Sequence, residues 1–82
     1  MSKTELYGTQ SCAFTNELRE ALEWQGVAFV EYDVEADPAA LRRMLALTGG
    51  GRTVPVLVED GVVTQIGWQG RGCMVAAPSP EG

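Results

Sequence analysis

Short runs of apolar residues, alternating with polar ones, recur along the chain and predict four strands. They cover residues 3–7, 27–34, 54–58 and 62–66. Pro55 interrupts the third run and favours a strand entry or an edge, because proline has no N–H group to give to a ladder. Asp60-Gly61, between the last two runs, is typical of a tight hairpin turn.

Two further segments repeat their apolar residues at three- and four-residue steps and predict helices. The first extends from about residue 12 to residue 25, with Ser11 as its N-cap and Gly26 at its end. The second begins at Asp37-Pro38, which pairs a capping carboxylate with proline at the first helical position, and it stops at three glycines. The inward-facing residues expected of the two helices are Phe14, Leu18, Ala21, Leu22, Leu41, Met44, Leu45 and Thr48.

The order strand, helix, strand, helix, strand, strand predicts an α/β fold with a four-stranded mixed sheet. A strand–helix–strand unit forms a right-handed parallel crossover, and the final hairpin adds antiparallel pairing. We expect one domain over residues 1–77. A disordered tail is expected over residues 78–82, where proline, serine and glycine replace the apolar pattern.

The composition restricts the classes of protein that the chain can represent. Its 82 residues are 45% hydrophobic and 21% charged, as in an ordinary globular domain. No apolar run approaches the roughly 20 residues of a membrane span, and the start does not resemble a secretory signal. We therefore expect a cytoplasmic protein with no membrane partner. The net charge of -5 argues against nucleic acid as a partner, because that binding needs Lys and Arg against phosphates.

Cysteine is the candidate for chemistry, because the sequence has no histidine. Ser–His–Asp and Cys–His hydrolases are thereby excluded. Cys12 and Cys73 are too few for a four-ligand zinc site. The acidic residues from Glu31 to Asp37 alternate as on the wet face of a strand, so we expect no metal. Three interpretations of the two cysteines are open: a reactive thiol, a redox pair, or two inert buried residues.

Cys12 stands at the predicted start of the first helix, where free N–H groups and the helix dipole favour an anion. The pKa of its thiol is therefore expected below the unperturbed value of about 8.5. Thr15, three residues on, can donate a hydrogen bond to the sulfur but cannot form a disulfide. The motif thus has a single cysteine. The alternative is that Cys12 is merely a small residue at a helix start.

The stretch Ser11-Cys12-Ala13-Phe14-Thr15, together with Thr53-Val54-Pro55, resembles the glutaredoxin branch of the thioredoxin fold. The resemblance implies that Pro55 is cis and that the Val54 backbone pairs with the peptide of glutathione. Arg52 matches a position where glutaredoxins often carry a basic residue for a glutathione carboxylate. Thr9 departs from the pattern, since glutaredoxins usually have a lysine there that helps to bind glutathione.

The stretch from Gly67 to Cys73 is similar to the Gly-Gly-Cys segment that binds the γ-glutamyl end of glutathione and opens the last helix of glutaredoxins. The chain stops near that helix, so a short or missing final helix is expected. The whole pattern most resembles the UXX-star family, whose members carry cysteine or selenocysteine first in a C/U-x-x-T motif. By this resemblance, the substrate-binding residues are Arg52, Thr53, Val54, Pro55, Gly67 and Arg71.

These observations lead to the hypothesis of a glutaredoxin-like thiol–disulfide oxidoreductase, a monomer or weak dimer. Cys12 attacks a disulfide or a glutathione mixed disulfide, with glutathione or protein thiols as partners. Cys73 either resolves Cys12 as a second thiol or is a packing residue. Trp24 and Trp68 are expected to pack inside the protein, and the alternative for Trp68 is an exposed contact with a partner. The alternative function is a non-catalytic module that holds glutathione, a peptide or an iron–sulfur cluster in the same groove.

Overall fold

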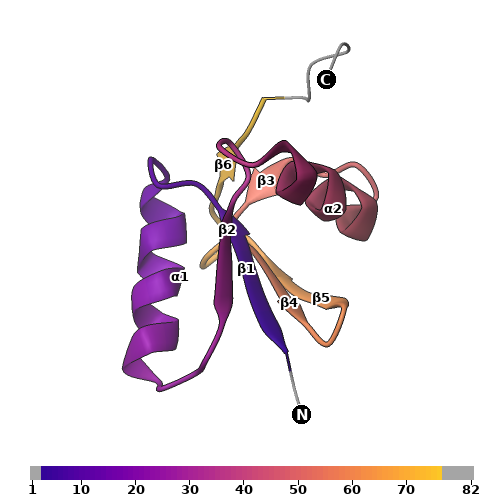
Figure 1. Cartoon of the computed structure of the whole chain (residues 1–82). Helices are drawn as coiled ribbons and strands as arrows, with labels where there is room; N and C mark the ends of the chain where they lie inside the picture. Colours follow the sequence, from indigo (N-terminus) through magenta and orange to yellow (C-terminus); the bar gives the residue numbers. More distant parts are fainter. Residues whose placement is uncertain (1–2, 77–82) are drawn as a thin grey trace.

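The computed structural model describes residues 3–76 and has two helices among its strands. The helices α1 and α2 lie on opposite sides of the central strands (Figure 1). The predicted tail at 78–82 lies outside the described residues. Neither helix within residues 3–76 is long and apolar enough to cross a membrane. The elements are, in chain order, β1 (Thr4–Gly8), α1 (Ala13–Trp24), β2 (Val30–Asp33), α2 (Pro38–Thr48), β3 (Thr53–Val54), β4 (Val56–Glu59), β5 (Val62–Ile66) and β6 (Cys73–Met74).

The main sheet has four strands in the order β2-β1-β4-β5. β1 pairs in parallel with β2, and β4 runs antiparallel to both β1 and β5. Asp60 and Gly61 take φ angles of 54° and 81° in the predicted hairpin turn, where left-handed conformations match the twist of the strands. The predicted α/β fold with a mixed four-stranded sheet is confirmed.

Pro55 divides the third predicted strand into two elements that belong to different sheets. β4 joins the main sheet, whereas β3 pairs antiparallel with β6, a two-residue strand that the hydrophobic pattern did not predict. The two short strands lie side by side at one end of the molecule (Figure 1). The Val54–Pro55 peptide bond is cis, as the resemblance implied. Within the described part of the chain, no helix follows β5.

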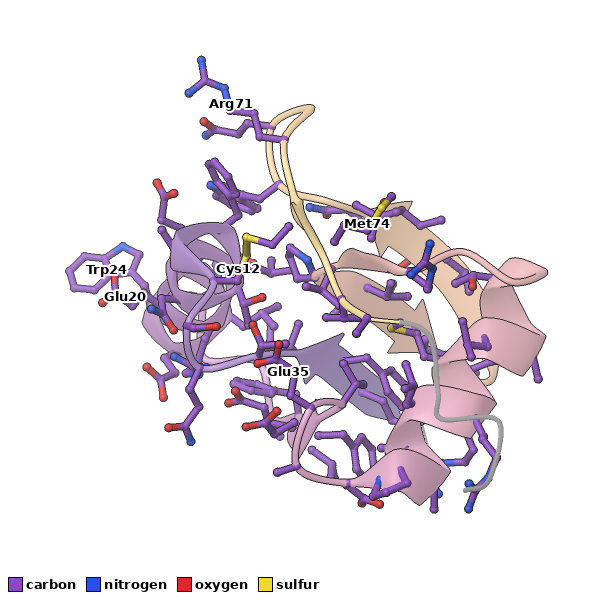
Figure 2. All side chains as sticks on the ribbon, turned by 90° about the horizontal axis from the view of Figure 1, so that it is seen from above. Cys12, Glu20, Trp24, Glu35, Arg71 and Met74 are labelled. Atoms are coloured by element: carbon purple, nitrogen blue, oxygen red, sulfur yellow. A yellow bond between two sulfur atoms is a disulfide. The ribbon has the colours of Figure 1, made fainter. Side chains whose placement is uncertain are left out.

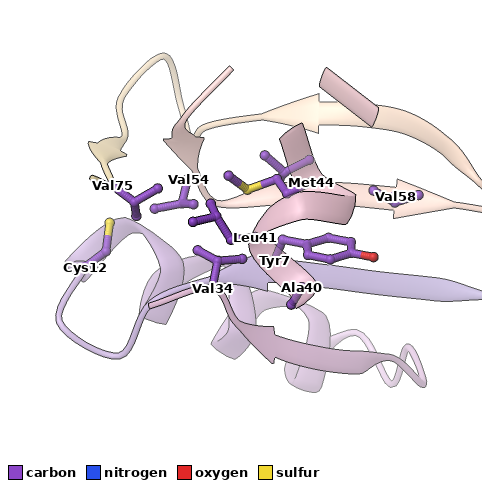
Figure 3. Packing of buried hydrophobic residues seen from close by; sticks show 10 residues of the cluster. Tyr7, Cys12, Val34, Ala40, Leu41, Met44, Val54, Val58 and Val75 are labelled. Carbon is purple, nitrogen blue, oxygen red and sulfur yellow. The ribbon is translucent and has the colours of Figure 1, made fainter. Parts of the chain in front are cut away.

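Two apolar clusters hold the helices against the sheet. Each fully buried Leu or Val side chain contributes about 1.5–3 kcal/mol to them. The cluster on the α2 side, shown in Figure 3, consists of Tyr7, Cys12, Val34, Ala40, Leu41, Met44, Val54, Val56, Val58 and Val75. The cluster on the α1 side consists of Leu6, Leu18, Leu22 and Leu57, with Val27, Phe29 and Trp68 packed against it.

The start of α1 differs from the prediction by one residue, and the difference concerns Cys12, the candidate for the reactive thiol. Cys12, not Ser11, is the N-cap: its backbone is extended, and its carbonyl accepts the first helical hydrogen bond from Asn16 N at 3.1 Å. Ser11 is exposed, and its hydroxyl lies 3.5 Å from that of Thr9. The second helix follows the prediction, since Asp37 accepts hydrogen bonds from the N–H groups of Ala39 and Ala40.

The prediction that Trp24 packs inside the protein is wrong. Trp24 is 91% exposed, because it stands two residues, or about 200° around the helix, from the buried Leu22. The second predicted strand also begins later than expected, at Val30. Val27 instead donates its N–H to the carbonyl of Leu22 at 3.0 Å and so belongs to the turn that ends α1.

Candidate active site

Cys12 lies at the N-terminus of α1 and forms a disulfide bond with Cys73 of β6 (Figure 2). Their Cα atoms are 6.0 Å apart, within the range of about 4.4–6.8 Å that a disulfide requires. Cys12 is 1% exposed. As the N-cap, it stands beside first-turn N–H groups that have no intrahelical partner, and such groups favour a thiolate when the bond is reduced.

β3 holds Cys73 in this position by pairing with β6. The register sets Val54 opposite Cys73 and Thr53 opposite Met74. One residue further, Val75 N donates to the carbonyl of Arg52 at 3.0 Å. Thr53, Val54 and the cis-Pro55 therefore lie beside the disulfide, and the strand that pairs with Thr53 and Val54 is the chain's own β6. Their substrate-binding role stays a prediction.

The loop from Gly67 to Gly72 turns the chain back towards Cys12. Gly67 N donates to the carbonyl of Pro55 at 2.7 Å, which fixes the start of the loop beside the cis bond. Trp68 and Arg71 exchange backbone hydrogen bonds across the turn. Gly67 has a φ of +81°, and a Cβ atom there would lie 2.6 Å from the carbonyl oxygen of Arg71. Only glycine fits this position.

Thr15 follows Cys12 by three residues and is fully buried, with its side chain against Gly8. The sequence predicts a hydrogen bond from its hydroxyl to the sulfur of Cys12. In the disulfide form, Thr15 Oγ1 has no hydrogen-bond partner among residues 3–76. A buried hydroxyl without a partner is unfavourable, and the hydrogen bond from Thr15 to Cys12 stays a prediction.

The two arginines predicted to bind carboxylates differ in their surroundings. Arg52 is half-buried, and its Nη1 donates to the carbonyl of Val75 at 3.3 Å. Arg71 is exposed and projects from the tip of the loop, away from Cys12 (Figure 2). The carboxylate-binding role of both residues stays a prediction.

Sequence reasoning missed a polar hollow of about 440 Å³ next to the Cys12 loop, between α1 and β2. Arg19 crosses it and donates hydrogen bonds to both carboxylate oxygens of Glu31, with 2.7 Å between Nε and Oε1. The hydrogen bond to Glu31 raises the pKa of Arg19 above its usual value. The Arg19–Glu31 pair thus connects α1 to β2, an edge strand of the main sheet. In the described residues, no three side chains of His, Cys, Asp or Glu come together as metal ligands.

The fold places a cysteine at a helix start and joins it to a second cysteine beside a cis-proline. The glutaredoxin family model matches residues 4–64. The chain belongs to the glutaredoxin family. A probable glutaredoxin of Synechocystis sp. is 40% identical over 60 residues, which make up 72% of this chain and 55% of that protein. The chain thus matches about half the length of this relative.

Solved structures resemble the chain over most of its length. A mutant of the thioredoxin-like protein BC3987 is 35% identical, with a TM-score of 0.74 over 84% of this chain and 86% of that one. The glutaredoxin of Archaeoglobus fulgidus has a TM-score of 0.69 over 84% of this chain and 78% of its own, at 20% identity. The second likeness shows the shared fold alone.

Proposed function

We propose that the protein is a thiol–disulfide oxidoreductase in which Cys12 is the nucleophile and Cys73 the resolving thiol. The observation that carries the proposal is the Cys12–Cys73 disulfide at the N-terminus of α1. Thr15 has no sulfur to serve as a partner within the motif, so an oxidised Cys12 needs a thiol from elsewhere. Cys73 is in bonding distance of it.

The reaction proceeds by two exchanges. The Cys12 thiolate attacks one sulfur of a glutathione mixed disulfide or a protein disulfide, a new bond to Cys12 forms, and the other sulfur leaves as a thiolate. The Cys73 thiolate then attacks the Cys12 sulfur, and the second substrate thiol leaves. The substrate gains two electrons and the protein loses two. Two molecules of glutathione, abundant in a reducing cytoplasm, return the protein to its dithiol form.

The neighbouring residues assist at defined steps. The first-turn N–H groups of α1 and the Thr15 hydroxyl stabilise the Cys12 thiolate, which lets it leave and attack near neutral pH. Val54 and Pro55 bind the substrate backbone, with Thr53 beside them. Arg52 and Arg71 attract its carboxylates, and Gly67 fixes the loop against Pro55. The protein acts as a monomer or weak dimer and needs no metal.

The test uses the reduced protein and the mixed disulfide of glutathione with 2-mercaptoethanol. The wild type should reduce this substrate with glutathione as the electron source, and Cys12→Ser should abolish the reaction. Cys73→Ser should accumulate glutathione on Cys12, detected by mass spectrometry. Glutathione that binds without turnover, or an iron–sulfur chromophore in the purified protein, would instead identify a binding module and contradict the proposal.

A further inference from the structure

The outer face of α1 carries a row of three side chains that point away from the sheet. Glu17, Glu20 and Trp24, here called the outer row, follow one another at steps of three and four residues and so lie along one line of the helix. All three are exposed. They stand roughly opposite the buried Leu18 and Leu22. Figure 2 shows Glu20 and Trp24 on the side of α1 that faces away from the rest of the molecule.

The packing of the domain does not account for Trp24. The residue is 91% exposed, and among residues 3–76 it belongs to neither apolar cluster. An aromatic ring of this size usually contributes to a core or to an interface. Tryptophan is enriched among the few residues that carry most of the binding energy at protein–protein interfaces. The fold therefore leaves the ring of Trp24 free for contact with another molecule.

The stability of α1 does not account for its glutamates either. Glu17 and Glu20 stand three residues apart, and like charges at this spacing repel each other. Glu23 lies in the last turn, where the helix dipole disfavours an anion. The one basic residue of α1, Arg19, is bonded to Glu31, and no ion pair in the described part of the chain includes a glutamate of the outer row. Their charges thus remain uncompensated.

Shape and charge together restrict what can bind to the outer row. The outer side of a helix is convex, whereas sites for small molecules are concave. The negative charge of Glu17 and Glu20 repels nucleic acid and anionic membrane surfaces. A helix with basic residues at three- and four-residue steps has the opposite charge and the same spacing as the outer row, which extends about 10 Å along the axis of α1.

We propose that the outer row is a docking site for a basic helix of a partner protein. An arginine of that helix stacks on the ring of Trp24, whose face attracts cations. Two further basic side chains of the helix pair with Glu17 and Glu20. The inference goes beyond the proposed function, and it stands whether or not Cys12 is catalytic, because the outer row includes neither cysteine.

The outer row lies close to the disulfide along the same helix. Glu17 follows Cys12 by five residues, which correspond to about 7.5 Å along the helix axis. A partner on the outer row is therefore held near the disulfide by non-covalent contacts alone. Its affinity should be the same for the oxidised and the reduced protein.

The first experiment uses an alanine-rich helical peptide of about 18 residues as the probe. The peptide carries a fluorescent label and three arginines on one face, at steps of four and three residues. Fluorescence anisotropy should show that it binds the full chain, more weakly as NaCl is raised from about 0.05 to 0.3 M. A peptide of the same composition with its arginines spread around the helix should bind about fivefold more weakly. No binding of the first peptide, or equal binding of both, would overturn the proposal.

A pair of apolar substitutions tests the ring. Trp24→Ala should weaken binding of the one-faced peptide about tenfold, the equivalent of 1.4 kcal/mol. Val62→Ala is the matched control, because Val62 is 63% exposed on β5, outside α1. Its affinity should stay within twofold of the wild type. Equal affinities of the two variants would rule out Trp24 as the anchor and with it the proposed site.

A pair of double substitutions tests the charges. Glu17→Gln with Glu20→Gln should weaken binding of the same peptide about tenfold. Glu35→Gln with Glu59→Gln removes the same net charge from exposed positions outside α1 and should change the affinity by less than twofold. If both double variants bind equally, the attraction comes from the net charge of the protein, and the outer row is not a docking site.

Two further outcomes would identify a different occupant and overturn the proposal. In the first, sedimentation shows a dimer of the wild type that Trp24→Ala dissociates, so that a second copy covers the outer row. In the second, Trp24→Ala abolishes binding while the loss of both glutamates has no effect, so that the occupant is apolar. A failure of the protein to reduce disulfides would contradict the proposed function and leave this docking site intact.

Discussion

Thr15 has a buried hydroxyl whose hydrogen bond is missing in the disulfide form. Its side chain is 0% exposed and fills the space above Gly8, where an added Cβ would lie 2.7 Å from Thr15 Oγ1. A hydroxyl left without a partner in such a site costs about 1–3 kcal/mol. The thiolate of reduced Cys12 is an acceptor that would remove this cost. We therefore expect Thr15 to favour the reduced state over the oxidised one.

Thr15→Val should show what the hydroxyl does in the oxidised protein and in the reduced protein, because valine keeps the shape of threonine without its hydroxyl. The oxidised protein should become more stable by about 1 kcal/mol, since no polar group is left unsatisfied. In the reduced protein, the pH midpoint for alkylation of Cys12 by iodoacetamide should move upward. Urea unfolding and the alkylation rate against pH measure the two effects. Thr15→Ser, which retains the hydroxyl, is the control. Loss of stability in the oxidised Thr15→Val protein would contradict the account.

At the scale of elements, Trp68 adds to the packing on the α1 side of the sheet. It packs against the cluster that includes Leu57 of β4 and Leu22 of α1. Trp24, at the end of α1, makes no such contribution, because 91% of its surface is exposed. The sequence predicted the same packing role for both residues. Composition alone does not show which of the two tryptophans is buried. The exposure of Trp24 depends on its angle around α1, whereas the packing of Trp68 depends on the fold of the glycine loop.

The two tryptophans provide a matched pair of substitutions. Trp68→Ala should lower the free energy of unfolding by about 2 kcal/mol, somewhat below the loss for a fully buried tryptophan because Trp68 is partly exposed. Trp24→Ala should change it by less than about 0.5 kcal/mol. Urea unfolding followed by circular dichroism gives both values without relying on tryptophan fluorescence. Equal losses in the two variants would show that Trp68 does not hold the α1 face.

In the whole molecule, the main sheet could be predicted from the sequence, whereas the end formed by β3 and β6 could be predicted only in part. Alternation and turn residues sufficed for the four main strands, both helices and the Asp60-Gly61 hairpin, because each is long enough to show its period. β6 has two residues and thus no period, and its place depends on pairing with β3, from which the whole of β4 and β5 separates it in the chain. The helix start that carries Cys12 was predictable, and the cis bond at Pro55 followed from family resemblance. The packing of Val75 and the burial of the Thr15 hydroxyl depend on the assembled core.

The disulfide joins these two parts, so its reduction should change the stability of the entire domain. Cys12 and Cys73 are 61 residues apart, and the chain-entropy model gives about 4 kcal/mol for closing a loop of this size. A domain of this length has a total stability of about 4–12 kcal/mol. The reduced protein should therefore unfold at a clearly lower urea concentration than the oxidised one. The variant Cys12→Ser with Cys73→Ser should unfold at the lower concentration in both oxidising and reducing buffer. If reduction leaves the unfolding midpoint of the wild type unchanged, then the Cys12–Cys73 bond contributes nothing to the stability of the domain.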